Sequence, residues 1–436
     1  MNVPLPLSRR AALAGIGAAA LSTVVGCGTG GSGTGTGTPG RLTVWFPGNS
    51  APEIELVTKT LVPEFEAANS AKVEVTYVDW GQISPKLNAA FAGNTAPDLF
   101  GHGPAAAAGF AKAQRIAPLD AQVASLPADD RQDLAAYLDG GKVDGKQYMV
   151  PLSGQGVLIA YRKDLFEGSG AVPPKTWAEA YDAAQKLTVR KGATVTRAGL
   201  LLQSAKTQRV VQAFLTLLSS EGGSLLSADG TKATWNSPEG VKALTYFANL
   251  YSGTTAVSNQ LGADFANQPA AQNPLATGEA AMVMVSAAQV TQIVKAKPEL
   301  ADKIAVLPPL SAATAKTFGG SGPGLFLNAD SKNQELAWKF IAYMASKSVA
   351  DRYAQAIGAV PVRASSLTGS YVSGQPLLKS FVQAGPAYVG SPNVASWVQV
   401  RDVLDKHVEQ ALAGKVSPKA ALDAAAAEAD PLLASK

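Results

Sequence analysis

The chain has 436 residues, of which 47% are hydrophobic and 16% charged, and 37 basic against 33 acidic residues give it a formal charge of +4. At ~150 residues per domain, this length suits two or three domains. The low, balanced charge argues against a disordered chain and gives no reason to expect a nucleic-acid partner. Two histidines and one cysteine are too few for a Cys/His zinc site or a disulfide framework within the chain.

The first residues are typical of an export signal. Arg9 and Arg10 precede an apolar run of small residues from 11 to 25, which is short for a membrane span of ~20 residues. The arginine pair is similar to a twin-arginine signal, with general export as the equal alternative. Residues 24–27 (VVGC) resemble a bacterial lipobox, so we expect residues 1–26 to be a lipoprotein signal peptide and Cys27 to be lipidated. An uncleaved anchor helix or a buried free cysteine is the simpler alternative.

A Gly/Thr-rich segment, 27–40, follows the lipobox and is expected to be a flexible tether. It contains a formal G-x-G-x-x-G at Gly35, Gly37 and Gly40. A dinucleotide loop should follow a strand and open a helix, so this match is attributed to composition. The sequence therefore predicts an exported protein that is lipid-anchored to the outer face of the cell membrane.

The body of the chain alternates strand and helix patterns. Residues 41–46 are β-branched and aromatic, and apolar residues then recur at helical spacing from Ile54 to Ala68. Residues 72–80 alternate as a strand, and 82–93 are a second helix candidate. Strand, helix, strand, helix is the rhythm of an α/β fold with parallel strands. No linker divides the body, which suits two lobes joined by more than one chain crossing.

Later helices are predicted from their capping residues. Each has a Ser or Thr just before an apolar-periodic run, followed by Pro or by Glu/Gln three residues on. These residues are Thr176 with Glu179, Ser237 with Pro238, Ser331 with Gln334, and Ser417 with Pro418.

Catalytic motifs are missing from the sequence. There is no H-E-x-x-H and no G-x-S-x-G. Residues 140–147 (GGKVDGKQ) approach a phosphate loop, but Gln147 replaces the required Ser/Thr and a strand-like run follows. No spacing singles out a carboxylate pair for glycoside hydrolysis, so a secreted glycoside hydrolase remains only the rival from another class. We expect a non-enzyme with no catalytic residue, cofactor or metal.

Several short segments, in order, resemble the extracellular solute-binding proteins, family 1, of bacterial ABC importers, whose best-known member binds maltodextrins. The resemblance covers essentially the whole body. The segments are 144–148 (DGKQY) with Pro151, 161–165 (YRKDL), 173–177 (PPKTW), 278–282 (GEAAM), 318–320 (FGG), 331–337 (SKNQELA) and 411–422 (ALAGKVSPKAAL).

The resemblance implies a two-lobed α/β fold in which each lobe is a sheet flanked by helices and the ligand cleft lies between the lobes. The N-lobe is expected to comprise 41–150 with 310–350, and the C-lobe 151–309 with 351–436. The implied function is a substrate-binding lipoprotein that captures a mono- or oligosaccharide and delivers it to an ABC permease, and we expect a monomer. The alternative is a glycerophosphate- or glycerophosphodiester-binding protein, and a sensor or scaffold lipoprotein is a further one.

The resemblance also implies a set of ligand-binding residues. Trp397 falls on the family's stacking tryptophan, with core packing as the alternative. Neutral Asn49 and Ser50 stand where the maltodextrin binder has an acid and a base. Arg401 or Arg363 would pair with phosphate in the alternative function. The expected ligand-binding residues are Phe46, Asn49, Ser50, Trp80, His102, Gln155, Ser204 (beside Gln203), Ser286, Gly320, Ser321, Trp397 and Arg401.

Overall fold

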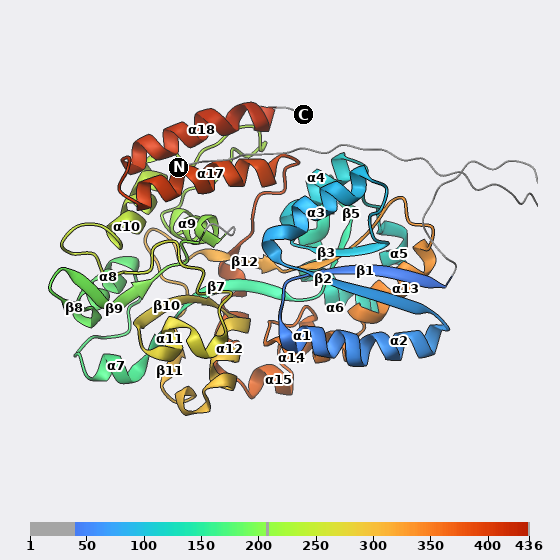
Figure 1. Ribbon diagram of the computed structural model, residues 1–436, viewed down its shortest axis with the longest axis horizontal. Helices are drawn as coiled ribbons and strands as arrows, with labels where there is room; N and C mark the ends of the chain where they lie inside the picture. Colours follow the sequence, from blue (N-terminus) through green and yellow to red (C-terminus); the bar gives the residue numbers. More distant parts are fainter. Residues whose placement is uncertain (1–39, 206–208, 435–436) are drawn as a thin grey trace, which may run out of the picture. The chain divides into compact units, whose positions relative to one another are not determined.

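The computed structural model describes residues 40–205 and 209–434. They belong to one compact unit that contains two large, separate sheets flanked by helices (Figure 1). This confirms the expected α/β class. The expected signal peptide, the lipidated Cys27 and the tether up to residue 39 lie outside the described residues.

The first sheet has five strands in the order β2-β1-β3-β13-β6. β1 pairs in parallel with β2 and β3, whereas β13 is antiparallel to β3 and β6. Buried residues alternate along the first half of β1, as its sequence predicts for a strand. The strands are β1 (Arg41–Pro47), β2 (Lys72–Val78), β3 (Leu99–His102), β6 (Met149–Pro151) and β13 (Gly324–Leu327).

Helices cover both faces of the first sheet. One face packs on α3 (Trp80–Ala92) and α4 (Ala107–Lys112) around Phe100 and Phe326. The core on the opposite face begins with a continuous helical segment: α1 (Ala51–Leu56) continues through the π-helical η1 (Val57–Leu61) into α2 (Val62–Asn69). The other helices of this core are α6 (Ala128–Leu138), α13 (Gln334–Ala345) and α14 (Lys347–Ile357).

The second sheet follows the order β14-β12-β7-β10-β9-β8, with β11 beside β7. β7 is antiparallel to β10, β11 and β12, whereas β10 runs parallel to β9. The strands are β7 (Gly154–Arg162), β8 (Val189–Lys191), β9 (Thr194–Leu201), β10 (Ala280–Ser286), β11 (Ile304–Val306), β12 (Thr317–Ser321) and β14 (Tyr388–Val389).

Helices also flank the second sheet on both faces. Met284 of β10 points to one core and Val283 to the other. The first core takes α8 (Trp177–Leu187), α9 (Arg209–Ser220), α10 (Pro238–Asn249), α17 (Trp397–Leu412) and α18 (Pro418–Ala434); the second takes α11 (Pro274–Thr277), α12 (Ala287–Ala296) and α16 (Pro376–Gln383).

Short elements complete the described chain. They are α5 (Asp120–Ala124), α7 (Lys163–Glu167), α15 (Ser370–Ser373), the 3₁₀ turns η2 (Pro104–Ala106), η3 (Asp139–Gly141), η4 (Ala270–Gln272), η5 (Pro298–Leu300), η6 (Ala364–Ser366) and η7 (Gly385–Ala387), and the hairpin of β4 (Lys142–Val143) with β5 (Lys146–Gln147). The hairpin occupies the phosphate-loop-like tract. Asp144 and Gly145, both at positive φ, make its two-residue turn.

Three of the four predicted caps form as expected. The Thr176 hydroxyl accepts from the Glu179 N–H in a capping box, and Ser237 and Ser417 accept from the N–H groups of Gly240 and Ala420. Ser331 does not cap α13. Its hydroxyl donates to Asp98 and accepts from the N–H of Asn333, the residue that precedes the helix.

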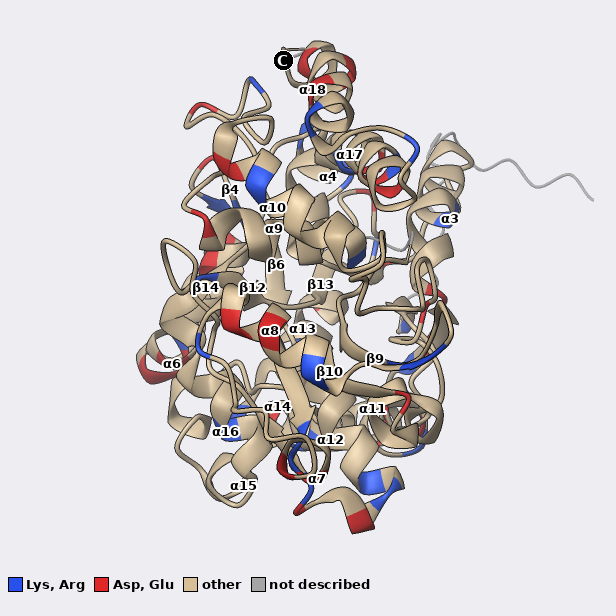
Figure 2. Ribbon diagram, turned by 90° about the vertical axis from the view of Figure 1, so that its left-hand side faces the viewer, with Lys and Arg blue, Asp and Glu red and all other residues tan. Residues whose placement is uncertain are grey.

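Three crossings join the two sheets and lie side by side. Residues 152–153 link β6 to β7, residues 322–323 link β12 to β13, and residues 358–363 lead out of α14. Backbone hydrogen bonds tie the crossings together: Leu152 N–H to Pro323 O and Gly322 N–H to Ser153 O, both 2.9 Å, and Gly154 N–H to Val360 O, 2.8 Å. The strands β6, β12 and β13 at this junction carry no charged residue (Figure 2).

These crossings differ from the expected lobe boundaries. β12 was expected within the first lobe, but it pairs with β7 in the second sheet. Tyr353 and Val362 were expected in the second lobe, but they pack in the core of the first. The returning segment of the first lobe therefore runs from about 323 to 362, because strand pairing and core packing, rather than sequence position, determine which residues belong to each lobe.

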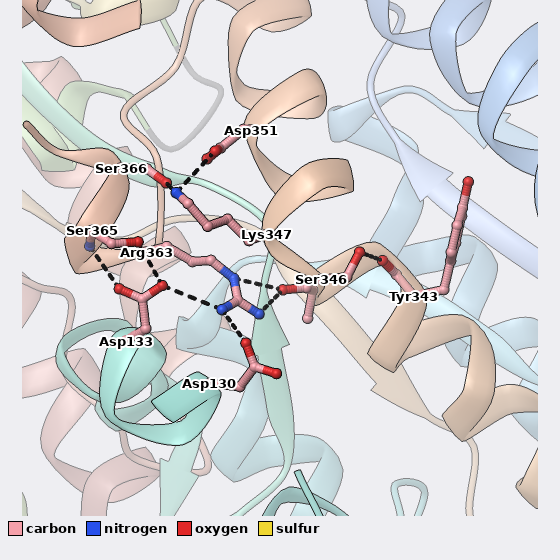
Figure 3. A network of polar contacts seen from close by, with 10 residues as sticks. Asp130, Asp133, Tyr343, Ser346, Lys347, Asp351, Arg363, Ser365 and Ser366 are labelled. Atoms are coloured by element: carbon pink, nitrogen blue, oxygen red, sulfur yellow. Dashed lines mark hydrogen bonds and ion pairs between the residues drawn. The ribbon is translucent and has the colours of Figure 1, made fainter. Parts of the chain in front are cut away.

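A buried arginine braces the third crossing (Figure 3). The Arg363 side chain is 3% exposed and forms ion pairs with Asp130 and Asp133 of α6. Its Nε donates to the carbonyl oxygen of Ala345 at the end of α13, at 2.9 Å. Asp133 also accepts from the backbone N–H of Ser365. Arg363 therefore ties the chain leaving α14 to two helices of the first sheet.

Candidate functional site

A large cavity lies between the two sheets and has a volume of about 1610 Å³. This exceeds the ~300–1,000 Å³ of usual small-molecule sites. Beside the first sheet, its lining residues lie within 46–53, 79–88 and 101–105, and at the crossings within 152–157 and 323–324. Beside the second sheet, most of them lie within 209–212, 264–273, 286–293 and 398–405.

The end of β1 supplies the first part of the cavity wall. Phe46, Asn49 and Ser50 all line the cavity, as expected. Phe46 is almost fully buried and stacks on Tyr77 of β2, with ring centroids 5.5 Å apart, so it offers little surface to a ligand. Asn49 is exposed and Ser50 half-buried, which leaves an amide and a hydroxyl free to donate and accept hydrogen bonds.

Trp80 is the aromatic residue of this wall. It begins α3, lines the cavity and is half-buried. Gly48 lies opposite, at φ +106°, where an added Cβ would come within 3.2 Å of the indole Nε1. The glycine therefore provides both the left-handed turn after β1 and the space beside the indole.

His102 supports this wall from behind rather than lining it. It is 4% exposed, and its Nε2 lies 2.9 Å from the hydroxyl of Ser84, which does line the cavity. Its ring meets Trp80 edge to face at 6.1 Å. Burial lowers the pKa of His102 to about 4, so the ring is neutral at physiological pH. The expectation that His102 itself donates to ligand does not agree with this position.

Glu53 is a cavity residue that the sequence did not single out. It follows β1 in the first turn of α1 and is 9% exposed. The Tyr353 hydroxyl of α14 donates to Glu53 Oε1 at 2.6 Å. Burial raises the pKa of Glu53 to about 7, because the charged carboxylate loses its hydration, and the hydrogen bond from Tyr353 offsets only part of this.

One face of α17 forms much of the opposite wall. Val398, Arg401, Asp402 and Asp405 follow the i, i+3, i+4, i+7 spacing of a helical face, and all four line the cavity. Arg401 Nη2 pairs with Asp402 Oδ1 at 2.8 Å. Asp405 is 3% exposed, its Oδ1 has no hydrogen-bond partner, and burial raises its pKa to about 7.

Trp397, the first residue of α17, points away from the cavity. It is 1% exposed and packs in the core of the second sheet with Val400 and Leu404. The structure therefore does not bring the expected stacking tryptophan to the site. The cavity-facing positions begin one residue later, and a helix turns by about 100° per residue.

The expected polar residues near the crossings divide between the cavity and the surrounding structure. Gln155 and Ser286 line the cavity, although the Ser286 hydroxyl also caps α12 by accepting from the Gln289 N–H. Gly320 and Ser321 are outside the lining. They pair with β7 as part of β12, and the Ser321 hydroxyl donates to the carbonyl oxygen of Tyr137, so they form no ligand-facing nest.

Ser204 also lies outside the cavity lining. It is 1% exposed, and its hydroxyl accepts from the Gly262 N–H at 3.0 Å. Arg209, at the start of α9, does line the cavity and was not expected. It donates to Gln203 Oε1 at 3.3 Å and to Asn267 Oδ1 at 3.2 Å, and burial lowers its pKa.

Within the described residues, no group of three or more His, Cys, Asp or Glu side chains is arranged to hold a metal ion. In the same part of the chain, no helix has both the length and the apolar character that crossing a membrane requires.

Comparison with known proteins identifies the family. The sequence profile of the family described as "Bacterial extracellular solute-binding protein" matches residues 51–351. The chain belongs to this family. A binding protein of Brucella abortus (strain 2308) is 26% identical over 399 residues, which cover 90% of this chain and 93% of that protein. The sn-glycerol-3-phosphate-binding periplasmic protein of Agrobacterium fabrum is 25% identical over 305 residues, covering 65% and 66% of the two chains.

Solved structures of solute-binding proteins share the fold. One from Thermotoga lettingae, with bound α-D-tagatose, is 25% identical and superposes with a TM-score of 0.79 over 90% of this chain and 99% of the other. The GacH receptor of Streptomyces glaucescens, solved unliganded and with acarbose, is 26% identical with a TM-score of 0.78, over 92% and 100% of the two chains. The two-lobed fold expected from the sequence is thereby confirmed, and both the family and these neighbours are binding proteins rather than enzymes.

Proposed function

We propose that this protein captures a carbohydrate in the cavity between its two sheets and delivers it to the membrane subunits of an ABC importer. The observation that carries this proposal is the placement of the Trp80 indole in a cavity wall that also carries the polar side chains of Asn49, Ser50 and Ser84. An aromatic face suits the C–H side of a sugar ring, while hydroxyl and amide groups suit its rim. The relatives that hold tagatose and acarbose support the same solute class.

The charges of the site favour this carbohydrate over a glycerophosphate. Arg401 is already paired with Asp402, and Arg209 donates to two side-chain amide oxygens. Arg363, the other expected phosphate partner, is buried against Asp130 and Asp133 and does not line the cavity. A phosphate would therefore have to break an existing ion pair or remain uncompensated near carboxylates.

We further propose that Cys27 holds the protein on the outer face of the cell membrane through its lipid. The lipobox-like residues 24–27 and the extracellular family support this placement. Replacing Cys27 with Ala should release the protein from the membrane fraction, and continued retention there would contradict lipidation.

A binding screen tests the carbohydrate. The purified protein would be titrated calorimetrically with neutral sugars, amino sugars and glycerophosphodiesters, and each sugar would be recovered afterwards to establish that it is unchanged. We expect binding of a sugar class, which Trp80→Ala weakens and Trp338→Ala, on the outer helix α13, does not. Binding of phosphodiesters alone would contradict the proposal, and hydrolysis of a bound sugar would favour the enzyme alternative.

A further inference from the structure

Acidic side chains outnumber basic ones in the lining of the cavity. Among the described residues the lining has five carboxyl groups and two guanidinium groups, and no lysine or histidine. The acids therefore outnumber the bases by three. The acids are Glu53, Asp79, Asp264, Asp402 and Asp405, and the bases are Arg209 and Arg401.

Both arginines are engaged by side chains of the same wall. Arg401 donates to Asp402, and Asp264 acts on Arg209 through its charge. The charge of Arg401 also reaches Asp405, but its hydrogen bonds go to Asp402. Among the described residues, no Lys or Arg forms an ion pair with Glu53 or with Asp405.

Two of the surplus carboxyl groups are buried, one on each wall. Asp405 is 97% buried, and its Oδ1 lacks a hydrogen-bond partner although the residue lines the cavity. Glu53 has Oε1 held by Tyr353. The nearby Tyr77 hydroxyl is also buried without a partner. Buried carboxyl groups without a cation are costly unless a proton or a bound cation compensates them.

We infer that the carbohydrate bound in this cavity carries amino groups, and that Glu53 on one wall and Asp405 on the other are the carboxylates that compensate their charge. The inference rests on the proposed function and names the class of sugar: a saccharide with a free amine. With a neutral sugar, each carboxyl group would be compensated by its proton alone, and an anionic sugar would face a surplus of acid. Ammonium groups instead supply positive charge beside the two buried carboxyl groups, where water screens the attraction less than at the surface.

The inference predicts a characteristic pH profile. Burial raises the pKa of Glu53 and of Asp405 to about 7, so both groups retain protons in the free protein near neutral pH. Binding an ammonium favours their ionised forms and releases protons. Affinity for the amine should therefore rise with pH up to about 7 and fall again when the amine loses its own proton, near ~8. A neutral sugar should show a nearly flat profile.

Glu53 and Asp405 each face a small set of charged and titratable groups. Tyr353 and Tyr77 face Glu53, and burial raises the pKa of both phenols, so they stay neutral in this range. Asp405 faces Arg401, Asp402 and Glu409 of its own helix and the backbone N–H of Val211 in α9. The other charged lining groups are Asp79, Arg209 and Asp264, and buried His102 behind the wall is neutral.

The test is calorimetry of the full chain with β-1,4-linked glucosamine di- and trisaccharides, their N-acetylated forms, and cellobiose and cellotriose. The free amines should bind at least about tenfold more tightly than the glucose forms near pH 7. They should also release protons, measured in two buffers of different ionisation enthalpy. Glu53→Gln and Asp405→Asn should each remove most of this preference and lower proton release, whereas Glu55→Gln, on the exposed side of the same helix as Glu53, should change neither.

Three outcomes would overturn the inference in distinguishable ways. If the neutral or N-acetylated sugars bind as tightly as the amines, the amine is wrong and the carbohydrate proposal stands. If the amines bind best but both variants keep the full preference, Glu53 and Asp405 are the wrong carboxylates. If no sugar binds, the carbohydrate proposal falls together with the inference. Thermal unfolding of each variant verifies that it is folded.

Discussion

The two walls of the cavity are built differently. On the first-sheet side, Asn49, Ser50 and Trp80 lie just beyond the ends of strands β1 and β2, whose backbone pairing fixes them. On the second-sheet side, Arg401 and Asp405 project from the side of a helix whose opposite face is core. The first wall presents an aromatic ring, neutral polar groups and the buried carboxyl group of Glu53, and the second presents the charged face of a helix. The first wall is therefore suited to a sugar ring and its hydroxyls, and each wall contributes one of the carboxyl groups that we propose to face an amino group.

The largest expected effect is a loss of stability on replacing Trp397, the core tryptophan, rather than Trp80, the cavity tryptophan. Trp397→Ala should lower the free energy of unfolding by about 3–5 kcal/mol, because it empties a fully buried site in the core of the second sheet. The folded fraction should keep its affinity for sugar. Chemical denaturation and calorimetry measure the two quantities. Lost affinity with unchanged stability would place Trp397 in the binding wall and contradict its assignment to the core.

The buried carboxyl groups of the two walls should make the free energy of unfolding depend on pH. The pKa of Glu53 is raised to about 7 in the folded protein, so the folded state holds a proton that the unfolded state loses at lower pH. Stability is therefore full at acidic pH and declines as pH rises through about 7, by up to about 3 kcal/mol for this group. Glu53→Gln should reduce the decline, measured by denaturation from about pH 4 to 8. An identical slope in the variant would mean that Glu53 is not buried as described.

The crossings that connect the walls should depend on Arg363. Arg363→Met should cost about 3 kcal/mol of unfolding free energy, because it leaves Asp130 and Asp133 without their buried cation. Arg352→Met is the matched control, since it breaks a more exposed pair with Glu64 and should cost about 1 kcal/mol or less. Equal losses in the two variants would show that the third crossing is not braced in this way.

The smallest expected effect concerns the aromatic wall. Trp80→Ala should weaken sugar binding by about 1–3 kcal/mol and leave stability nearly unchanged, because the half-buried indole contributes more to the cavity surface than to the core. Calorimetric titration measures the affinity. Unchanged binding in a folded variant would remove the ring-stacking role from this wall.

Much of the fold was predictable from local patterns. Alternation along β1 and the Thr176–Glu179 capping box depend on neighbouring residues, and both formed as expected. The positions after β1 and β2 were predictable too, because a strand end directly determines where the next residues lie. Pairing partners were not predictable, so residues 317–321 were assigned to the wrong lobe.

The second wall was harder to predict because it depends on the rotation of a helix. Trp397 carries the family resemblance, but the cavity face of α17 begins at Val398. The spacing of Val398, Arg401, Asp402 and Asp405 was a visible signal of a single helix face. Nothing in the sequence showed whether that face met the core or the cavity. Glu53 gave no signal, because its burial depends on Tyr353, 300 residues away in sequence.

Intrinsic fluorescence tests the central claim most directly, because Trp80 is the only tryptophan among the described residues that lines the cavity. Sugar titration of the wild-type protein should change its tryptophan emission. The same titration of Trp80→Phe, which keeps an aromatic ring, should bind with little emission change, and Trp397→Phe should respond like the wild type. A response that persists in Trp80→Phe and disappears in Trp397→Phe would contradict this account and place the sugar against the other tryptophan.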